Sequence, residues 1–217
     1  MKHIFVETNW VVDYAMPAYR QELPAAELVQ DAQAGKVMLH LPACCLAEAR
    51  HPILTHNQPR VVTLFRQFLK WGAAIGRIDA ADLASSRKTL EIFEKELKAH
   101  LNKVDSILQG ISQIPGVEVF ALNDRMLKRA ADFSAKNLGL RQTFDLAILA
   151  AVLVRCEELK ADGQHDLNFC EQDSDLQPWG KDNNSKQTLL ALYNAAGVWV
   201  FRDFTLSDPP KPSNWPS

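Results

Sequence analysis

Five short apolar segments, separated by stretches with helical periodicity, constrain most strongly how this chain can fold. The apolar segments are predicted as β-strands at residues 4–6, 37–41, 117–122, 167–170 and 198–201. Between them lie helical stretches, among them 25–34, 124–137, 145–159 and 187–196. Strands that alternate with helices form parallel sheets, because each crossover packs a helix against the sheet. We therefore predict an α/β fold with a five-stranded parallel sheet flanked by helices.

A long helical stretch interrupts this alternation. The 217 residues suffice for one large domain, and we predict a single domain over 1–206 that includes a helical insertion at about 52–115. Within it, one helix is expected to stop at Pro52, a second to begin near Asn57-Gln-Pro59, and a third to run from about 80 to 111. The proline-rich segment 207–217 is predicted to be an extended tail.

The chain shows no signal for a membrane or an oxidising compartment. No apolar run approaches the roughly 20 residues that span a bilayer, and the start lacks the apolar core of a signal peptide. We expect a cytoplasmic protein. The four cysteines have no metal-binding or redox spacing and are expected to be buried reduced thiols. They are Cys44, Cys45, Cys156 and Cys170.

Charge is distributed unevenly along the sequence, although the net charge is only −2. Residues 50–77 contain five basic side chains and no acidic one, whereas residues 142–185 contain nine acidic and three basic side chains. Like charges that are concentrated in this way repel one another. The pattern therefore indicates that like charges are concentrated in parts of the molecule, at some cost in free energy.

Four acids follow predicted strands or open predicted helices at equivalent places. They are Glu7, Glu48, Asp145 and Asp173. The carboxyl ends of parallel strands face one crevice, so all four can point into one cleft. Carboxylates held so near to one another are stable together only when cations neutralise them. Oxygen ligands select hard ions such as Mg²⁺ or Mn²⁺. The sequence therefore predicts a metal centre able to activate water beside a phosphodiester.

These residues resemble the motifs of the PIN-domain nucleases. The similarity rests on four stretches, Phe5-Val-Glu-Thr-Asn9, Leu41-Pro-Ala-Cys-Cys-Leu-Ala-Glu48, Phe144-Asp-Leu-Ala-Ile-Leu-Ala-Ala151 and Phe169-Cys-Glu-Gln-Asp-Ser-Asp-Leu176. It covers about 1–50 and 117–201, and the helical insertion makes this chain larger than the compact toxin-type members. The likeness implies an enzyme, a ribonuclease that cleaves single-stranded RNA with Mg²⁺ or Mn²⁺.

Carried over by position, the resemblance assigns roles to individual residues. Glu7, Glu48, Asp145 and Asp173 would be the catalytic acids that hold the metal, and Asp175 an auxiliary acid. Thr8 and Asn9 would form hydrogen bonds around the first carboxylate. Two residues depart from the family pattern. Glu7 stands where the family normally has Asp, and Glu171 stands where it has a hydroxyl residue.

Basic residues supply candidate contacts to single-stranded or structured RNA. They are Arg50, Arg66, Lys70, Arg125 and Arg129. In 50–77 they alternate with aromatic rings, as in a track for a single strand, although a solvated helix face explains the same charges, and Phe65 is expected in the core. By family analogy, a homodimer and an inhibitory protein partner of the antitoxin type are further expectations.

Each motif alone has a plainer structural interpretation. Glu48 fits an exposed helical position, Asp145 fits a first helical turn, and Asp173-Ser-Asp175 fits a turn. We therefore keep a second hypothesis, a PIN-like module that binds RNA or a protein partner without cleaving. A third takes Asp173-Ser-Asp175 as the metal-binding motif of a nucleotide-sugar transferase, which leaves the other acids unexplained.

Overall fold

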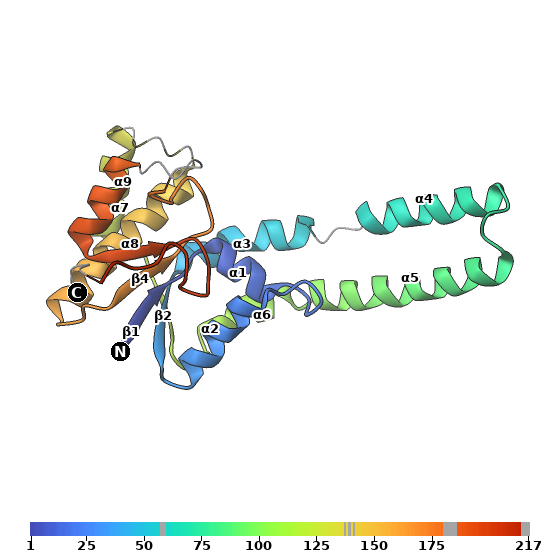
Figure 1. The fold of residues 1–217 in the computed structure, drawn as a ribbon, viewed down its shortest axis with the longest axis horizontal. Coiled ribbons are helices and arrows are strands. Elements are labelled where there is room, and N and C mark those ends of the chain that lie inside the picture. The colour runs from blue at the N-terminus through green and yellow to red at the C-terminus, as the bar shows by residue number, and fades with distance from the viewer. Residues whose placement is uncertain (57–59, 137, 139, 141, 180–185, 214–217) are drawn as a thin grey trace.

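One parallel sheet organises the chain in the computed structural model, which describes residues 1–56, 60–136, 138, 140, 142–179 and 186–213 (Figure 1). Its strands are β1 (Lys2–Phe5), β2 (Val37–Pro42), β3 (Val117–Phe120), β4 (Leu167–Cys170) and β5 (Val198–Phe201). They pair in the order β3-β2-β1-β4-β5, and every pair is parallel. The predicted five-stranded α/β fold is confirmed.

The strand order creates a switch point beside β1. The chain moves outward from β1 through β2 to β3, and then returns to the other side of β1 with β4 and β5. Helices that leave β1 and β4 therefore diverge to opposite faces, and a crevice opens at the carboxyl ends of these two strands. Glu7 and Glu171 lie just beyond those ends.

Helices cover both faces of the sheet. Their bounds are α1 Thr8–Ala15, α2 Leu23–Gln33, α3 Ala43–His56, α4 Arg60–Ala74, α5 Ala80–Leu101, α6 Val104–Ile111, α7 Asp124–Ala135, α8 Thr143–Ala161 and α9 Gln187–Ala196. Figure 1 shows α7, α8 and α9 on one side of the sheet, with α1, α2 and α6 on the other. Residues 148–154 of α8 are all buried, which explains why the helix is apolar around its circumference. No helix among the described residues is long and apolar enough to cross a membrane.

Three predicted helix boundaries are wrong. Pro52 lies inside α3, which is held by Cys45, Ala49 and Ile53 on its buried face, so the loss of one backbone hydrogen bond does not end it. The helix expected over 80–111 is interrupted at 102–103, between α5 and α6. Helix α8 begins at Thr143, two residues before the predicted start at Asp145. The helix entry expected at 57–59 and residue 137, where another helix was expected to end, lie outside the described residues.

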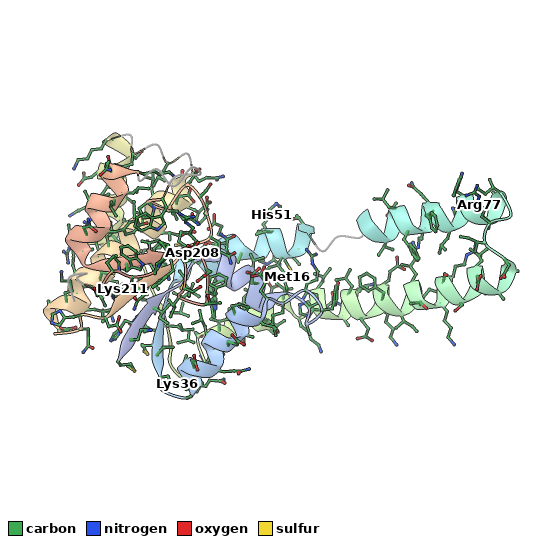
Figure 2. The ribbon with its side chains drawn as sticks, viewed as in Figure 1. Met16, Lys36, His51, Arg77, Asp208 and Lys211 are labelled. Carbon is green, nitrogen blue, oxygen red and sulfur yellow. The ribbon has the colours of Figure 1, made fainter. Side chains whose placement is uncertain are left out.

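Two helices of the predicted insertion leave the body of the protein. Helices α4 and α5 form a long hairpin, here called the arm (residues 60–101), which projects away from the sheet (Figure 1). Figure 2 places Arg77 at its tip. Buried side chains line the junction of the two helices, namely Val62, Leu69, Leu90 and Leu97. By contrast, α6 packs against α1 and α3 and so belongs to the body.

A chain of hydrogen-bonded polar side chains runs across β1, β2 and β3. The ring of His40 is buried, its Nε2 lies 2.8 Å from Nδ1 of His3, and its Nδ1 bonds Glu118. His40 is therefore an interior residue whose two ring nitrogens both have hydrogen-bond partners. All four cysteines are free thiols, and Cys44 alone among them is partly exposed.

Two glycines test how tightly the edge strand β3 is fixed. Gly116 and Gly35 both have positive φ, but a Cβ at Gly116 would lie 2.4 Å from the backbone oxygen of Ala32, whereas one at Gly35 would meet nothing within 4 Å. We expect Gly35→Ala to lower the free energy of unfolding by about 1–2 kcal/mol through backbone strain. Gly116→Ala should cost a further ~1–3 kcal/mol through overpacking. Urea unfolding followed by circular dichroism measures both, and equal losses would contradict the packing argument.

Candidate functional site

A cleft of about 490 Å³ opens at the carboxyl ends of β1 and β4. It is lined by residues from α1, α3, α8 and the loop after β4, namely Glu7, Thr8, Asn9, Ala47, Glu48, His51, Pro52, Phe144, Asp145, Ile148, Asp173 and Leu176. Four carboxylates from four separate segments of the sequence therefore share one cleft. Glu7 and Asp145, which are far apart in sequence, face the same space.

Glu7 is the N-cap of α1 and the most deeply buried of the four predicted acids. Its Oε2 accepts a hydrogen bond of 2.7 Å from the backbone N–H of Asn9, while Oε1 is buried without a partner. Burial raises the pKa of Glu7 to about 8, opposed by the Asn9 hydrogen bond and reinforced by the charges of Glu48 and Asp173. The Glu7 carboxylate thus caps the helix that it precedes, as the shorter Asp side chain commonly does.

Glu48 lies in the second turn of α3 and is held by Thr8. The Thr8 hydroxyl donates a hydrogen bond to Oε2 of Glu48. The resemblance predicted that Thr8 would bond the first carboxylate, and this prediction is wrong, because the Thr8 side chain reaches across to α3 instead. Asn9 does bond Glu7 as predicted, through its backbone N–H. Thr8 thus couples the positions of α1 and α3 on either side of the cleft.

Asp145 is the third residue of α8, where the helix dipole favours a negative charge. It is only 5% exposed, and its Oδ2 is buried without a partner. Burial raises the pKa of Asp145 to about 6, and repulsion from Asp173, Glu48 and Asp175 adds to this. The dipole therefore does not suffice to offset burial among like charges.

The loop after β4 is folded around a carboxylate that the sequence did not assign to the site. Oε1 of Glu171 accepts the backbone N–H of Asp173 at 2.6 Å, and Oδ1 of Asp173 accepts that of Asp175 at 2.8 Å. Glu171 is fully buried, and burial followed by repulsion from Glu7 raises its pKa well above the usual range. Its signal in the sequence was a charge directly after an apolar strand. The ammonium of Lys186 caps the loop by donating to the carbonyls of Ser174 and Asp175 at 2.6 and 2.9 Å.

Three buried carboxylate oxygens at this place have no hydrogen-bond donor within the described chain. They are Oε1 of Glu7, Oδ2 of Asp145 and Oε2 of Glu171. Buried carboxylates without donors must bind protons or cations. The donor set, all oxygen and all anionic, fits a hard divalent ion. As they stand, no three His, Cys, Asp or Glu side chains of the described residues converge closely enough to hold a metal, so binding would require these side chains to draw together.

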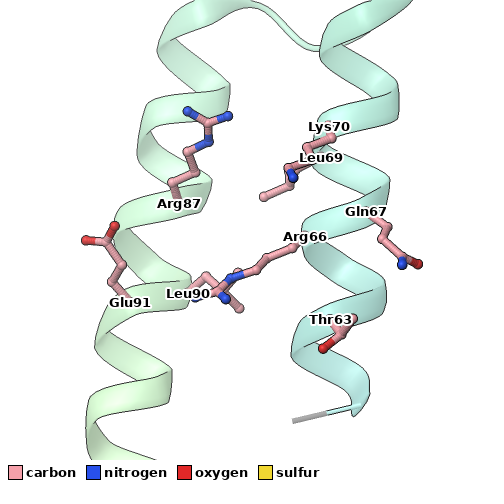
Figure 3. Close-up of a pocket in the computed structure, with 8 residues that line it drawn as sticks. All are labelled: Thr63, Arg66, Gln67, Leu69, Lys70, Arg87, Leu90 and Glu91. Carbon is pink, nitrogen blue, oxygen red and sulfur yellow. The ribbon is translucent and has the colours of Figure 1, made fainter.

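The basic residues predicted to contact RNA mostly pair with acids. Arg50 bonds Asp105 on α6 at 2.7 Å, and Arg66 pairs with Glu94 across the arm. Arg125 and Arg129 on α7 both pair with Glu157 on α8. Lys70 is exposed and lines a second cleft of about 510 Å³ between α4 and α5, with Arg66 and Arg87 (Figure 3).

Phe65 on α4 is more exposed than the sequence predicted. Phe65 was expected in the core, but it is 42% exposed on α4, because the inner face of that helix is already occupied by Val62 and Leu69. Asp13 does not line the cleft. Burial and the charge of Glu22 nevertheless raise the pKa of Asp13 to about 6.

Comparison with known proteins adds no relative. No family model, no curated protein and no solved structure matches this chain.

The raised pKa values predict how stability depends on pH. The folded state binds protons at Glu7 and Asp145 more tightly than the unfolded chain does, so their contribution is most favourable below about pH 4 and is lost as the pH rises toward 8. We expect Glu7→Gln to stabilise the metal-free protein at pH 8 by more than about 1 kcal/mol and to change little at pH 5. Thermal unfolding in EDTA measures this.

The control for this prediction is Glu27→Gln, which removes a carboxylate from an exposed position on α2. It should retain the wild-type pH dependence. An unchanged pH dependence in Glu7→Gln would show that Glu7 is already ionised and compensated.

Proposed function

We propose that this protein is a metal-dependent endoribonuclease of the PIN type, acting on single-stranded RNA. The observation that carries the proposal is the meeting of Glu7, Glu48, Asp145 and Asp173 in one cleft, with buried carboxylate oxygens that have no donor among the described residues. Structural burial of like charges is unfavourable, and such arrangements cluster at functional sites. The four resembling motifs supply the acids, and the parallel sheet supports the same family.

A bound ion would be held by Glu7, Glu48, Asp145 and Asp173, with Asp175 at the margin. The chemistry supplied by a bound Mg²⁺ or Mn²⁺ is Lewis-acid stabilisation of a phosphate oxygen and activation of water. The Asn9 N–H, at 2.7 Å from Glu7, stabilises the ionised form of that carboxyl. Thr8 orients Glu48 through its hydroxyl, and Glu171 fixes the turn that presents Asp173.

The rim of the cleft offers a feature suited to a nucleic-acid strand. Phe144 lines the cleft directly before Asp145, and its ring is 42% exposed. Single-stranded recognition depends on bases that stack on exposed aromatic rings beside the backbone site. Because Phe144 and Asp145 are neighbours at the start of α8, a stacked base would bring its phosphodiester close to the acids.

Metal binding is tested without any measurement of cleavage. We expect Mn²⁺ to raise the thermal midpoint of the wild-type protein at pH 7.5. The gain in folding free energy should grow with the logarithm of the Mn²⁺ concentration and reach about 2.7 kcal/mol at a hundred times the dissociation constant. Asp173→Asn should abolish most of this rise, whereas the exposed variant Glu27→Gln should retain it. Equal rises in all three proteins would place the ion elsewhere.

Cleavage is tested with an end-labelled single-stranded RNA and Mn²⁺. Asp145→Asn should lower the cleavage rate by at least ~100-fold. Replacing residues that only hydrogen-bond to metal ligands already costs about 10–100-fold in metal affinity or activity. Asp82→Asn is the matched control, since Asp82 is also the third residue of its helix, α5, and is exposed. Equal rates in Asp145→Asn and wild type would refute the assignment of the cleft.

One observation favours a second candidate, a PIN-like module that binds RNA or a protein without cleaving. Glu7 replaces the shorter acid of the family and uses one oxygen to cap α1, and its raised pKa favours the neutral form at pH 7. A neutral Glu7 weakens the ligand set. RNA binding without cleavage by the wild-type protein, in Mn²⁺ and at pH 8.5, would support this module.

A further inference from the structure

The outer side of the arm carries a continuous row of large apolar side chains that remains exposed. Between 42% and 58% of each is accessible, and the row consists of Leu64, Phe65, Phe68, Trp71 and Ile75. The rings of Phe65, Phe68 and Trp71 follow one another along the helix with centroids 6.2 Å apart. Ile75 follows α4 directly, and its N–H still bonds the Trp71 carbonyl. Scattered exposed apolar residues are ordinary, but a contiguous row is not.

The spacing of this row is that of a helix–helix seam. Leu64, Phe68, Trp71 and Ile75 recur at intervals of four, three and four residues, which is the heptad spacing of paired helices. Helix α4 already uses another face, with Val62 and Leu69 buried against α5. A helix with two apolar faces is typical of a bundle with more than two helices. The arm supplies only two.

Positive charge lies on a different side of α4 from the row. Successive residues of an α-helix are rotated by about 100°, so Arg66 projects almost opposite to Phe68. Arg66 and Lys70 line the cleft toward α5 (Figure 3). A nucleic-acid strand stacked on the rings would need cations beside them for its phosphates. Between Leu64 and Ile75, the residues that border the seam, Gln67, Gly72 and Ala74, carry no charge.

The absence of charge beside the seam also limits which protein can dock there. Two identical seams meet without repulsion between like charges, whereas a charged partner would find no complementary group there. The exposed part of the row is on the order of 400–500 Å² per chain, taking about half of each side chain. Two copies would thus bury on the order of 1,000 Å², the lower limit for a specific interface.

We propose that this face of α4 is the docking site for a second copy of the chain, α4 against α4, so that the two arms complete a four-helix bundle. The arm projects away from the body (Figure 1), which leaves α4 open to a second arm along its length. The interface is isologous, because each copy contributes the same row. Phe68 and Trp71 lie at its centre and are its energetic anchors.

Sedimentation equilibrium of the full chain, over about 1–100 µM, tests the proposal across the affinity range of such interfaces. We expect the wild-type protein to form a dimer and Phe68→Glu to raise the dissociation constant by about thirtyfold or more. Ile92→Glu is the matched control. Ile92 is 56% exposed on α5, and it lies about 200° around that helix from Leu90, which packs in the arm. This variant should dimerise as the wild type does.

Folding is checked by circular dichroism, and Trp71→Ser gives a second variant that should also be monomeric. A wild-type protein that stays monomeric at 100 µM, or a Phe68→Glu variant with the wild-type dissociation constant, overturns the proposal. So does equal weakening by Ile92→Glu. If the wild-type chain is monomeric and Phe68→Glu instead weakens binding of labelled oligouridylate, the row belongs to RNA rather than to a second copy.

Discussion

Repulsion among buried carboxylates is the constraint on which the functional interpretation of this structure depends. The strand order brings the carboxyl ends of β1 and β4 together, and the segments that follow them bury Glu7 and Glu171 near Asp145. Local backbone features hold each acid in place, namely the start of α1, the first turn of α8 and the turns after β4. Apolar side chains at these positions would be more favourable for folding alone. The buried acids are therefore unfavourable for folding, and the metal ion proposed above would neutralise them.

Most of the fold could be predicted because the short apolar runs that form the strands are mostly bounded by polar residues or glycine. The bounds of β4, α9 and β5 match the prediction, and Gly197, in a left-handed conformation, separates the last two elements. Tertiary packing overrode local signals elsewhere. Pro52 did not end α3, since burial of one face maintained the helix. The projection of the arm from the body could not be predicted, because periodicity marks an apolar face without showing what it packs against.

The sequence predicted which acids lie in the cleft better than it predicted the hydrogen bonds that hold them. Glu7, Glu48, Asp145 and Asp173 meet as expected, because parallel topology alone places strand ends at one edge. Which donor bonds which acid depends on side-chain conformations that spacing does not encode, so the contact from Thr8 to Glu48 was missed. The involvement of Glu171 was missed for a related reason. A charge after a strand can point outward or inward, and only the packed structure shows that it is fully buried.

The arm belongs to a single crossover, the one that joins β2 to β3. Both strands must find each other across everything inserted between them, but the entropy of closing a flexible loop grows only with the logarithm of its length, about 0.6 kcal/mol for each doubling. The hairpin also forms by contacts between residues close in sequence, which are quick to establish. Its length can therefore change during evolution with little consequence for the sheet, so that the reach of the arm and the geometry of the cleft are free to diverge independently in descendants of this chain.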